Sequence, residues 1–273
     1  VKREKKALIS GNDRDLPPVL DQIEKLGKND YLVLEISNRQ LIGFDYSPEI
    51  GVITNLFPTH LDDHPTLKAY KYVKQNLIRY QSSKQKAVLN FDDPEVMDLS
   101  SNTKAQPFYF SLEREPKQGS FLKDNQAYWQ GEKKPVLNFN QVKLPGLHNQ
   151  ANILAAITVG KIVNISNSAI QEAGYSSRGL KHRIEYVTSK KGISYYNDSQ
   201  STNPLSAVAA IKSFREPIIL IAGGKAKPNP QDFNILVEEI MAAGNIKALL
   251  LIGESAGQIK EEFNKLSSSK ERR

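Results

Sequence analysis

Short apolar runs that alternate with stretches of helical spacing constrain the fold of this chain more than any other feature of its sequence. Residues 31–37 and 50–56 are such runs, and their side chains favour buried strands. In residues 65–83, apolar side chains recur every three or four positions, as on one face of a helix. Strands that alternate with helices predict an α/β fold with a mostly parallel sheet that is covered on both faces.

A second unit begins near residue 183. Strand-like runs occupy residues 218–222 and 246–252, each run is followed by glycine, and the segments between and after them have helical spacing. This pattern is typical of a Rossmann-like domain. We therefore expect a central α/β domain in residues 1–182 and an incomplete Rossmann-like domain in residues 183–273.

Shorter elements are expected in three other places. Residues 106–145 predict a small antiparallel sheet in the central domain, because short apolar runs alternate there with polar turns. Residues 148–163, which follow a Pro-Gly pair, predict an apolar helix. Residues 184–187 and 193–196 predict a strand pair that opens the second domain.

Composition narrows the classes of protein to which the chain can belong. Of its 273 residues, 39% are hydrophobic and 25% charged, which is typical of a globular protein. The chain has no cysteine, which excludes disulfides, thiolate zinc sites and a cysteine nucleophile and fits a reducing cytoplasm. The net charge is +7, but residues 2–6 carry +3 of it and residues 270–273 carry +2. Terminal charge runs are usually solvated, so we do not expect a nucleic-acid partner. No apolar run approaches the length of a membrane span.

Lys74 stands out because helical spacing places it on the same face as Tyr70 and Leu77. Burial favours the neutral amine of a lysine, which can capture CO₂ to give an anionic carbamate. The alternative is an ordinary ammonium group that reaches solvent past its apolar neighbours. Glu35, in the last part of a predicted strand, is a candidate Mg²⁺ ligand or the ion-pair partner of a lysine.

Polar residues gather in the segment around His60. Residues 59–64 read Thr-His-Leu-Asp-Asp-His and follow a predicted strand. Such side chains can bind a metal or phosphate, but their spacing matches no standard zinc motif, and similar loops are often polar turns. At the start of the next apolar helix, Asn149 and Asn152 are three positions apart and share a face that could receive a ligand. Helix capping would explain one of these asparagines.

Two polar loops follow strands of the second domain. Residues 197–204 offer Asp198 for a ribose, and residues 223–227 offer Lys227 for a carboxylate or phosphate. Each could be an ordinary loop. Because both are expected at the same edge of a parallel sheet, together they favour a binding site.

In this order, the segments resemble the Mur ligases, and within that family the branch that adds D-glutamate. The resemblance runs from about residue 10 to residue 253. It rests on the stretches LEIS, VITNLFPTHLDDH, the helix with Lys74, VLNFDD, LPGLHNQANILAA, GLKHRIEYV, NDSQSTNP and IAGGKAK. Each stretch alone is weak, whereas the whole set in the correct order is specific. The resemblance implies that the central domain is ATPase-like.

The resemblance also implies an activity. The family forms amide bonds, so this chain would come from a cytoplasmic, ATP- and Mg²⁺-dependent ligase of peptidoglycan synthesis, which supports cell shape and division. The enzyme would convert UDP-N-acetylmuramoyl-L-alanine to an acyl phosphate, which D-glutamate would then attack. Its partners would be these small molecules, without nucleic acid or membrane, and it would act as a monomer.

Particular residues acquire roles by the same resemblance. Mg²⁺ would be held by Glu35, His60 and Lys74 as its carbamate. The residues near the nucleotide would be Asn149, Asn152, Arg183 and Asp198. The substrate-binding residues would be Asn12, Ser37, Gln40, His182, Thr202 and Lys227, the last two on the D-glutamate carboxylates. Catalysis would depend on Lys74, Arg183 and Lys227.

The sequence departs from the family pattern at several points. It contains no glycine-rich phosphate-binding loop that ends in Gly-Lys-Thr, it begins without methionine, and the UDP-binding domain and the end of the last domain are missing. Thr59 and Gln200 stand where the family usually has Asp and Lys. We therefore expect the gene product to start earlier and the 273-residue chain alone to be inactive. The alternatives are another Mur-type ligase, for a different amino acid or for folate polyglutamate, and a non-catalytic divergent homologue.

Overall fold

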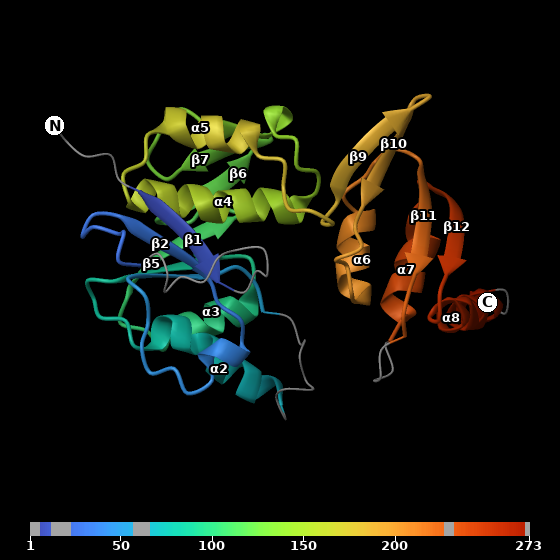
Figure 1. The fold of residues 1–273 in the computed structure, drawn as a ribbon, viewed down its shortest axis with the longest axis horizontal. Coiled ribbons are helices and arrows are strands. Elements are labelled where there is room, and N and C mark those ends of the chain that lie inside the picture. The colour runs from blue at the N-terminus through green and yellow to red at the C-terminus, as the bar shows by residue number, and fades with distance from the viewer. Residues whose placement is uncertain (1–5, 12–22, 57–65, 227–231, 271–273) are drawn as a thin grey trace. The chain divides into compact units, whose positions relative to one another are not determined.

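Helices and strands alternate along the chain in the computed structural model, as the sequence predicts (Figure 1). The structure describes residues 6–11, 23–56, 66–226 and 232–270. The chain divides into two compact units. Unit 1 comprises Val1–Phe110 with Lys117–Gly119, and unit 2 comprises Ser111–Pro116 with Ser120–Arg273. The predicted boundary near residue 183 stays a prediction.

Parallel strands dominate unit 1. The strands β1 (Ala7–Gly11) and β2 (Tyr31–Glu35) pair in parallel, with Gly11 opposite Glu35. A second parallel set runs in the order β3 (Ile50–Ile53), β4 (Lys86–Asn90) and β5 (Gln106–Ser111). The strand β5, which was expected among the antiparallel strands, thus pairs in parallel with β4. The helix α3 (Pro94–Ser100) supplies the crossover that a parallel strand requires, and the sequence patterns above did not include it.

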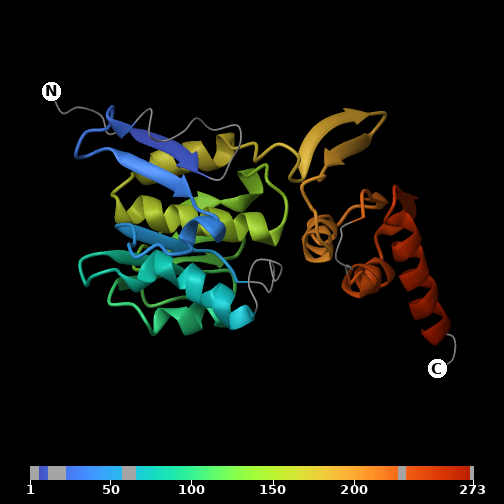
Figure 2. The ribbon, with the colours of Figure 1, turned by 60° about the horizontal axis from the view of Figure 1, so that its bottom comes forward.

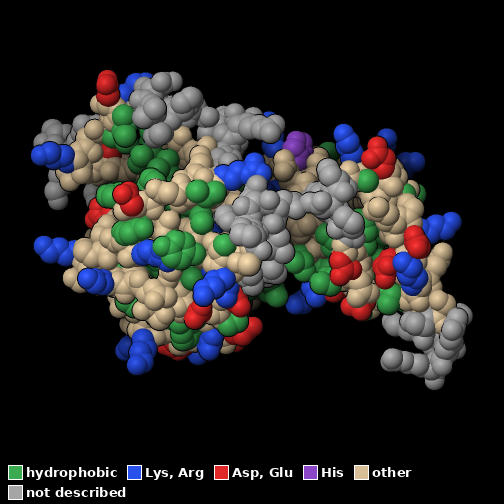
Figure 3. All heavy atoms as spheres, turned by 90° about the horizontal axis from the view of Figure 1, so that it is seen from below, with side chains coloured by type: hydrophobic (Ala, Val, Ile, Leu, Met, Phe, Trp, Pro, Cys, Tyr) green, Lys and Arg blue, Asp and Glu red, His purple; other side chains and the backbone are tan. Residues whose placement is uncertain are grey.

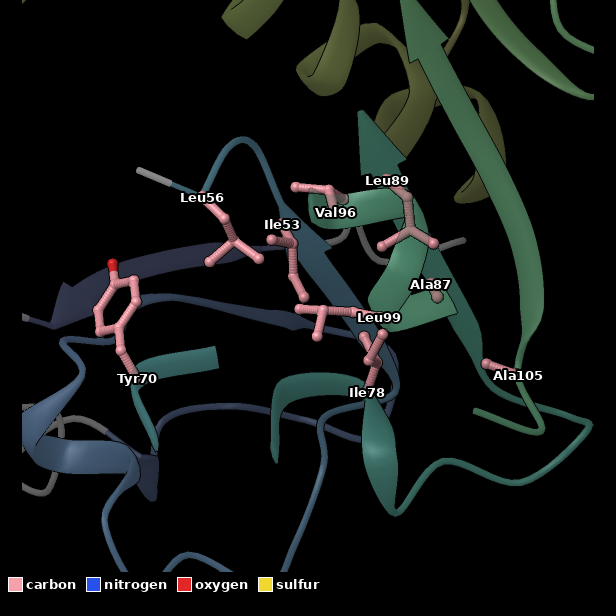
Figure 4. Packing of buried hydrophobic residues seen from close by; sticks show 9 residues of the cluster. All are labelled: Ile53, Leu56, Tyr70, Ile78, Ala87, Leu89, Val96, Leu99 and Ala105. Carbon is pink, nitrogen blue, oxygen red and sulfur yellow. The ribbon is translucent and has the colours of Figure 1, made fainter. Parts of the chain in front are cut away.

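Two helices cover the parallel strands of unit 1 through one apolar cluster. The helix α2 (Leu67–Arg79) begins at Thr66, whose hydroxyl accepts a hydrogen bond of 3.1 Å from the amide of Ala69. Figure 4 shows side chains from β3, α2, β4 and α3 packed together in this cluster. Its buried members are Ile53, Leu56, Tyr70, Ile78, Ala87, Leu89, Val96, Leu99 and Ala105. Each large apolar side chain in such a core contributes about 1.5–3 kcal/mol to stability.

Antiparallel strands follow in the chain, as predicted for the remainder of residues 106–145. The strand β7 (Gln126–Trp129) pairs antiparallel with both β6 (Gly119–Lys123) and β8 (Leu137–Asn138). The helix α4 (Leu147–Ile162) packs on β6, where the buried Ser120 hydroxyl donates to the carbonyl of Leu154 at 2.7 Å. The helix α5 (Asn167–Ser176) follows α4.

The later part of unit 2 has the predicted Rossmann-like order. It opens with the antiparallel pair β9 (Glu185–Lys190) and β10 (Ile193–Asn197). The strands β11 (Ile218–Gly223) and β12 (Ile246–Ile252) then pair in parallel. Three helices pack together against one face of this pair: α6 (Pro204–Ile211), α7 (Asn234–Ala242) and α8 (Ala256–Lys270). Figure 2 shows α6 and α7 nearly end-on beside each other.

Candidate site residues lie at the carboxyl ends of strands or in the loops that follow them. Glu35 ends β2 and Gly223 ends β11, and both strands belong to parallel pairs, beyond whose carboxyl ends ligands bind in open α/β sheets. Asn197 ends β10, which belongs to a separate antiparallel pair. The expectation that the loops after Asn197 and Gly223 share one edge of a parallel sheet is therefore wrong. Among the described residues, no helix is long and apolar enough to cross a membrane.

Candidate active site

Lys74 is half-buried on α2, beside the buried ring of Tyr70. Its Nζ lies 5.9 Å from the centroid of that ring. Burial lowers the pKa of the Lys74 ammonium from its ordinary value, and the negative charge of Glu35 raises it by a smaller amount. The net lowering of the pKa enlarges the fraction of neutral amine, which is the form that reacts with CO₂.

Glu35 and Lys74 both lie in unit 1 and are 39 positions apart in the sequence. They are close enough in space for the charge of Glu35 to act on Lys74. The side chain of Glu35 is exposed at the end of β2, where a carboxylate suits a hard cation such as Mg²⁺. The described residues include no group of three or more His, Cys, Asp or Glu side chains that could hold a metal. His60, the other predicted ligand, lies outside the described residues.

Ser37 and Gln40 hydrogen-bond each other. The Ser37 amide and hydroxyl donate to Gln40 Oε1 at 2.8 and 3.0 Å, and the Gln40 amide approaches Ser37 Oγ at 3.3 Å. This reciprocal pattern has the spacing of a capping box and overlaps the start of the short 3₁₀ helix Arg39–Leu41, whose own N-cap residue is Asn38. The two side chains therefore shape the turn after β2, and their contact with a substrate stays a prediction.

Asn90 at the end of β4 and Asp93 just after it hold the described residues that precede the His60 segment. Asn90 Nδ2 donates to the carbonyl of Thr54 at 2.9 Å, and Asp93 Oδ2 accepts from the amide of Leu56 at 2.9 Å. The other oxygen of Asp93 caps α3 by accepting from the amides of Glu95 and Val96. The sequence signal for this role was the Asp-Pro pair at residues 93–94, which is typical of a helix start.

At the start of α4, the capping explanation for the asparagines is wrong. Gly146 is the N-cap residue, with φ of +95°, and no side chain caps this helix. Asn149 instead donates from Nδ2 to the carbonyl of Pro145 at 2.7 Å, whereas the side chain of Asn152 is exposed. The predicted contact of either asparagine with a nucleotide is not tested by this geometry.

Asp198 anchors the backbone at the start of the second predicted domain. Its Oδ1 accepts from the amide of Ile184 at 3.0 Å, and its Oδ2 accepts from the hydroxyl of Ser201. Ile184 and His182 have φ of +47° and +63°, which is rare for a β-branched residue such as Ile184. The carboxylate of Asp198 therefore holds a strained backbone in place. A role of Asp198 toward a ribose stays a prediction.

The ring of His182 belongs to the same network. Asn197 Nδ2 lies 2.9 Å from His182 Nδ1, and Glu185 Oε2 accepts from the His182 amide at 2.8 Å. Burial lowers the pKa of the neighbouring His148 ring, while the charge of Asp198 raises it and that of Arg183 lowers it. The charges of Arg183 and Asp198 thus both reach the ring of His148.

The remaining predicted site residues are either exposed or outside the described part of the chain. Arg183, Gln200 and Thr202 have exposed side chains. The amide of Gln200 donates to the carbonyl of His182 at 3.0 Å, and the amide of Thr202 donates to the carbonyl of Gln200 at 2.9 Å. Asn12, Thr59 and Lys227 lie outside the described residues.

Solved structures share this fold. The MurF structure from Acinetobacter baumannii has a TM-score of 0.65 at 17% identity, over 96% of this chain and 60% of that one. The pseudomurein peptide ligase type C from Methanothermus fervidus has a TM-score of 0.66 at 15% identity, over 96% of this chain and 67% of that one. The chain therefore has the α/β fold class of these solved structures.

The sequence narrows this class to one family. The Mur ligase middle domain matches residues 5–160, which is more than half of the chain. The chain belongs to the Mur ligase family.

Curated relatives extend the similarity beyond the middle domain. The UDP-N-acetylmuramoylalanine–D-glutamate ligase of Bacillus mycoides (strain KBAB4) is 37% identical over 258 residues, which cover 94% of this chain and 55% of the relative. The ligase of the same name from Bacillus cereus (strain G9842) is 38% identical over 257 residues, with the same coverage. The chain thus spans about half the length of these relatives.

Proposed function

We propose that this chain belongs to an ATP-dependent ligase that adds D-glutamate to UDP-N-acetylmuramoyl-L-alanine in peptidoglycan synthesis. The observation that carries the proposal is the 37% identity to D-glutamate ligases, which extends over 94% of the chain. A similarity of this extent includes the strand-end loops as well as the middle domain. We also propose a central domain in residues 1–182 and a Rossmann-like domain in residues 183–273.

The proposed reaction has two steps. The substrate carboxylate attacks the γ-phosphorus of ATP, so that a carboxyl C–O–P bond forms as the bond to ADP breaks. The amine of D-glutamate then attacks the acyl carbon, loses a proton, and displaces inorganic phosphate to leave an amide. Both steps build up negative charge on oxygen, and fixed positive charges or hydrogen-bond donors lower their barriers.

Two described residues fit the Mg²⁺ ion that this chemistry needs. Glu35 offers an exposed carboxylate whose charge reaches Lys74, and Lys74, once carbamylated, would offer two further oxygens. Mg²⁺ would neutralise phosphate charge when it is bound. His60 is proposed as a third ligand from the family resemblance. Arg183 and Lys227 are proposed to contact phosphate and carboxylate groups, with Asn149, Asn152 and Asp198 near the nucleotide.

The remaining contacts follow the same proposal. Asn12, Ser37, Gln40 and His182 would face the substrate, and Thr202 would contact D-glutamate. The partners would be small molecules, and the enzyme would be a cytoplasmic monomer. On the face that Figure 3 shows, the described Lys and Arg side chains are scattered among acidic ones. Nucleic-acid binding usually requires them to cluster.

The test is a substrate-dependent assay of the full-length protein. Release of ADP and phosphate should require both UDP-N-acetylmuramoyl-L-alanine and D-glutamate, and the product should contain one new amide. A panel of other amino acids and of folates distinguishes the other Mur-type ligases. The absence of turnover with every acceptor, in a folded protein, would favour a non-catalytic homologue.

A further inference from the structure

We propose that Glu254 and Ser255 are positioning residues that fix the Gly223–Gly224–Lys225–Ala226 loop, the loop that leads to the proposed substrate-binding Lys227. This inference rests on the proposed function, in which that loop contributes to binding D-glutamate. The contacts lie within unit 2, between the segments that follow β11 and β12. None of the roles considered so far includes either residue.

Four hydrogen bonds join the two segments. The amide and the hydroxyl of Ser255 both donate to the carbonyl of Gly224, at 3.1 and 3.2 Å. The amide of Gly224 donates to the carbonyl of Ile252 at 3.0 Å. The amide of Ala226 donates to Glu254 Oε2 at 3.1 Å. The first three contacts hold the base of the loop, and the fourth holds its last described residue.

Glycine makes this close approach possible. Gly223 has φ of +128°, and a Cβ there would lie 2.0 Å from the carbonyl oxygen of Ile252. Gly253 has φ of +70°, and a Cβ there would lie 2.6 Å from the carbonyl oxygen of Gly224. A side chain at either position would push the segments apart. The sequence therefore keeps both sides of the contact free of side chains.

Glu254 and Ser255 contribute differently. Ser255 is only 6% exposed, and its hydroxyl donates to the carbonyl of Gly224, so its removal would also disturb packing. Glu254 is exposed, and its contact with the Ala226 amide spans 28 positions of sequence. A charged acceptor strengthens such a hydrogen bond. Glu254 can therefore be replaced without opening the core, and its substitution tests the loop itself.

The loop connects this contact to function. Lys225 is exposed within it, and Lys227 follows Ala226 directly in the sequence. A lysine that binds a carboxylate needs a fixed backbone, because the ordering of a flexible loop reduces affinity. Fixing of the Ala226 amide by Glu254 should therefore matter for the affinity for D-glutamate and little for ATP.

The experiment compares Glu254→Ala, Glu254→Gln and the control Glu261→Ala in the full-length protein. Glu261 is exposed on α8, where its carboxylate pairs with Lys265 at 3.2 Å. Glu261→Ala therefore removes an acidic side chain and leaves the four hydrogen bonds of the loop in place. Hydrogen exchange of a peptide that covers residues 224–226 should be about tenfold faster in Glu254→Ala only. KM for D-glutamate should rise about tenfold in that variant, with kcat and the KM for ATP nearly unchanged. Glu254→Gln retains an acceptor and should restore most of both properties.

The outcomes separate this inference from the proposed function. If the wild-type protein does not use D-glutamate, the proposed function fails, and the exchange data still decide whether Glu254 fixes the loop. Equal exchange in Glu254→Ala and Glu261→Ala would overturn the positioning contact. Faster exchange with an unchanged KM for D-glutamate would overturn its role in substrate binding.

Discussion

At the scale of single residues, Lys74 is a position at which one sequence pattern permits two interpretations. Its apolar neighbours in the sequence permitted either a solvent-reaching ammonium or a modified amine. In the structure it is half-buried, its pKa is lowered by burial, and the carboxylate of Glu35 is near. Partial burial lowers the energetic cost of losing the proton, while access to solvent lets CO₂ reach the amine.

Lys74→Ala is expected to reduce kcat of the full-length protein by about 100-fold or more, because a group that stabilises charge at the reacting centre would be lost. Added bicarbonate should not restore activity, since no amine remains. NMR with ¹³C-labelled CO₂ should detect a carbamate in the wild type and not in the variant. The control is Lys71→Ala, because Lys71 lies on the same helix and pairs with Glu95. Full activity of Lys74→Ala would contradict the assignment.

Gln200 offers a second test at this scale. Its side chain is exposed and its backbone bonds to His182 and Thr202, so a lysine fits without burial of charge. A charge-assisted contact is worth roughly 1.5–3 kcal/mol, so Gln200→Lys should raise kcat with D-glutamate about tenfold if that charge is missing. Ser199→Lys, which adds the same charge one position away, is the control. An unchanged rate would show that another cation compensates or that position 200 lies away from the reaction.

At the scale of elements, Asp93 links a helix cap to the candidate active site. One carboxylate oxygen caps α3, and the other holds the Leu56 amide just before the segment that contains His60. Asn90 adds a bond to Thr54. The stretch VLNFDD was part of the family resemblance, and the structure gives its last residue a physical task.

Asp93→Ala should lower the free energy of unfolding by about 1–2 kcal/mol, because both the cap and the Leu56 contact are lost. Asp93→Asn keeps an acceptor for the cap and should lose less. Urea denaturation measures the difference through the shift of the midpoint. Asp98→Ala, an exposed position on the same helix, serves as the control. Equal midpoints for Asp93→Ala and Asp98→Ala would refute the proposed role.

Periodicity predicted the elements that bury an apolar face and missed those that do not. The helix α2 and the strands β2, β3, β11 and β12 were expected from their apolar spacing or apolar runs, whereas β1 was not. The helix α5 has no buried residue and so leaves no apolar stripe in the sequence. The helix α3 is too short for a clear period, and without it β5 could not be recognised as a parallel strand.

The candidate site was predictable by residue type more than by contact. The residue patterns singled out Glu35 and Lys74 separately, and the family resemblance grouped them. In the structure the charge of Glu35 reaches Lys74. The hydrogen bonds of Asp198 to Ile184 and of Glu254 to Ala226 join positions far apart in sequence, which no local pattern reveals. Ser37 and Gln40, in contrast, match the local capping-box pattern of positions three apart.

At the scale of the whole molecule, the number of groups that can contact a triphosphate limits what these 273 residues can do. Phosphoryl transfer depends on a cradle of donors and cations around the β- and γ-phosphates. The printed sequence contains no Gly-Lys-Thr loop, and the chain spans 55% of the relative from Bacillus mycoides. Among the described residues, Arg183 is an exposed cation assigned to that task, and one guanidinium cannot replace a loop of backbone amides.

The purified 273-residue chain is therefore expected to release no ADP above background, with or without UDP-N-acetylmuramoyl-L-alanine and D-glutamate. The full-length protein under the same conditions is the positive control, and a folded state of the shorter chain is checked by a cooperative thermal transition. Nucleotide binding and phosphoryl transfer have different requirements. The contacts predicted for Asn152 and Asp198, with the nucleotide and its ribose, can give weak binding of ATP. They do not stabilise charge on the phosphoryl group as it moves, so they do not support its transfer. Weak nucleotide binding in a titration is thus compatible with the prediction. Substrate-dependent release of ADP by the short chain would contradict it, and would show that residues 1–273 contain a complete phosphate cradle of another kind.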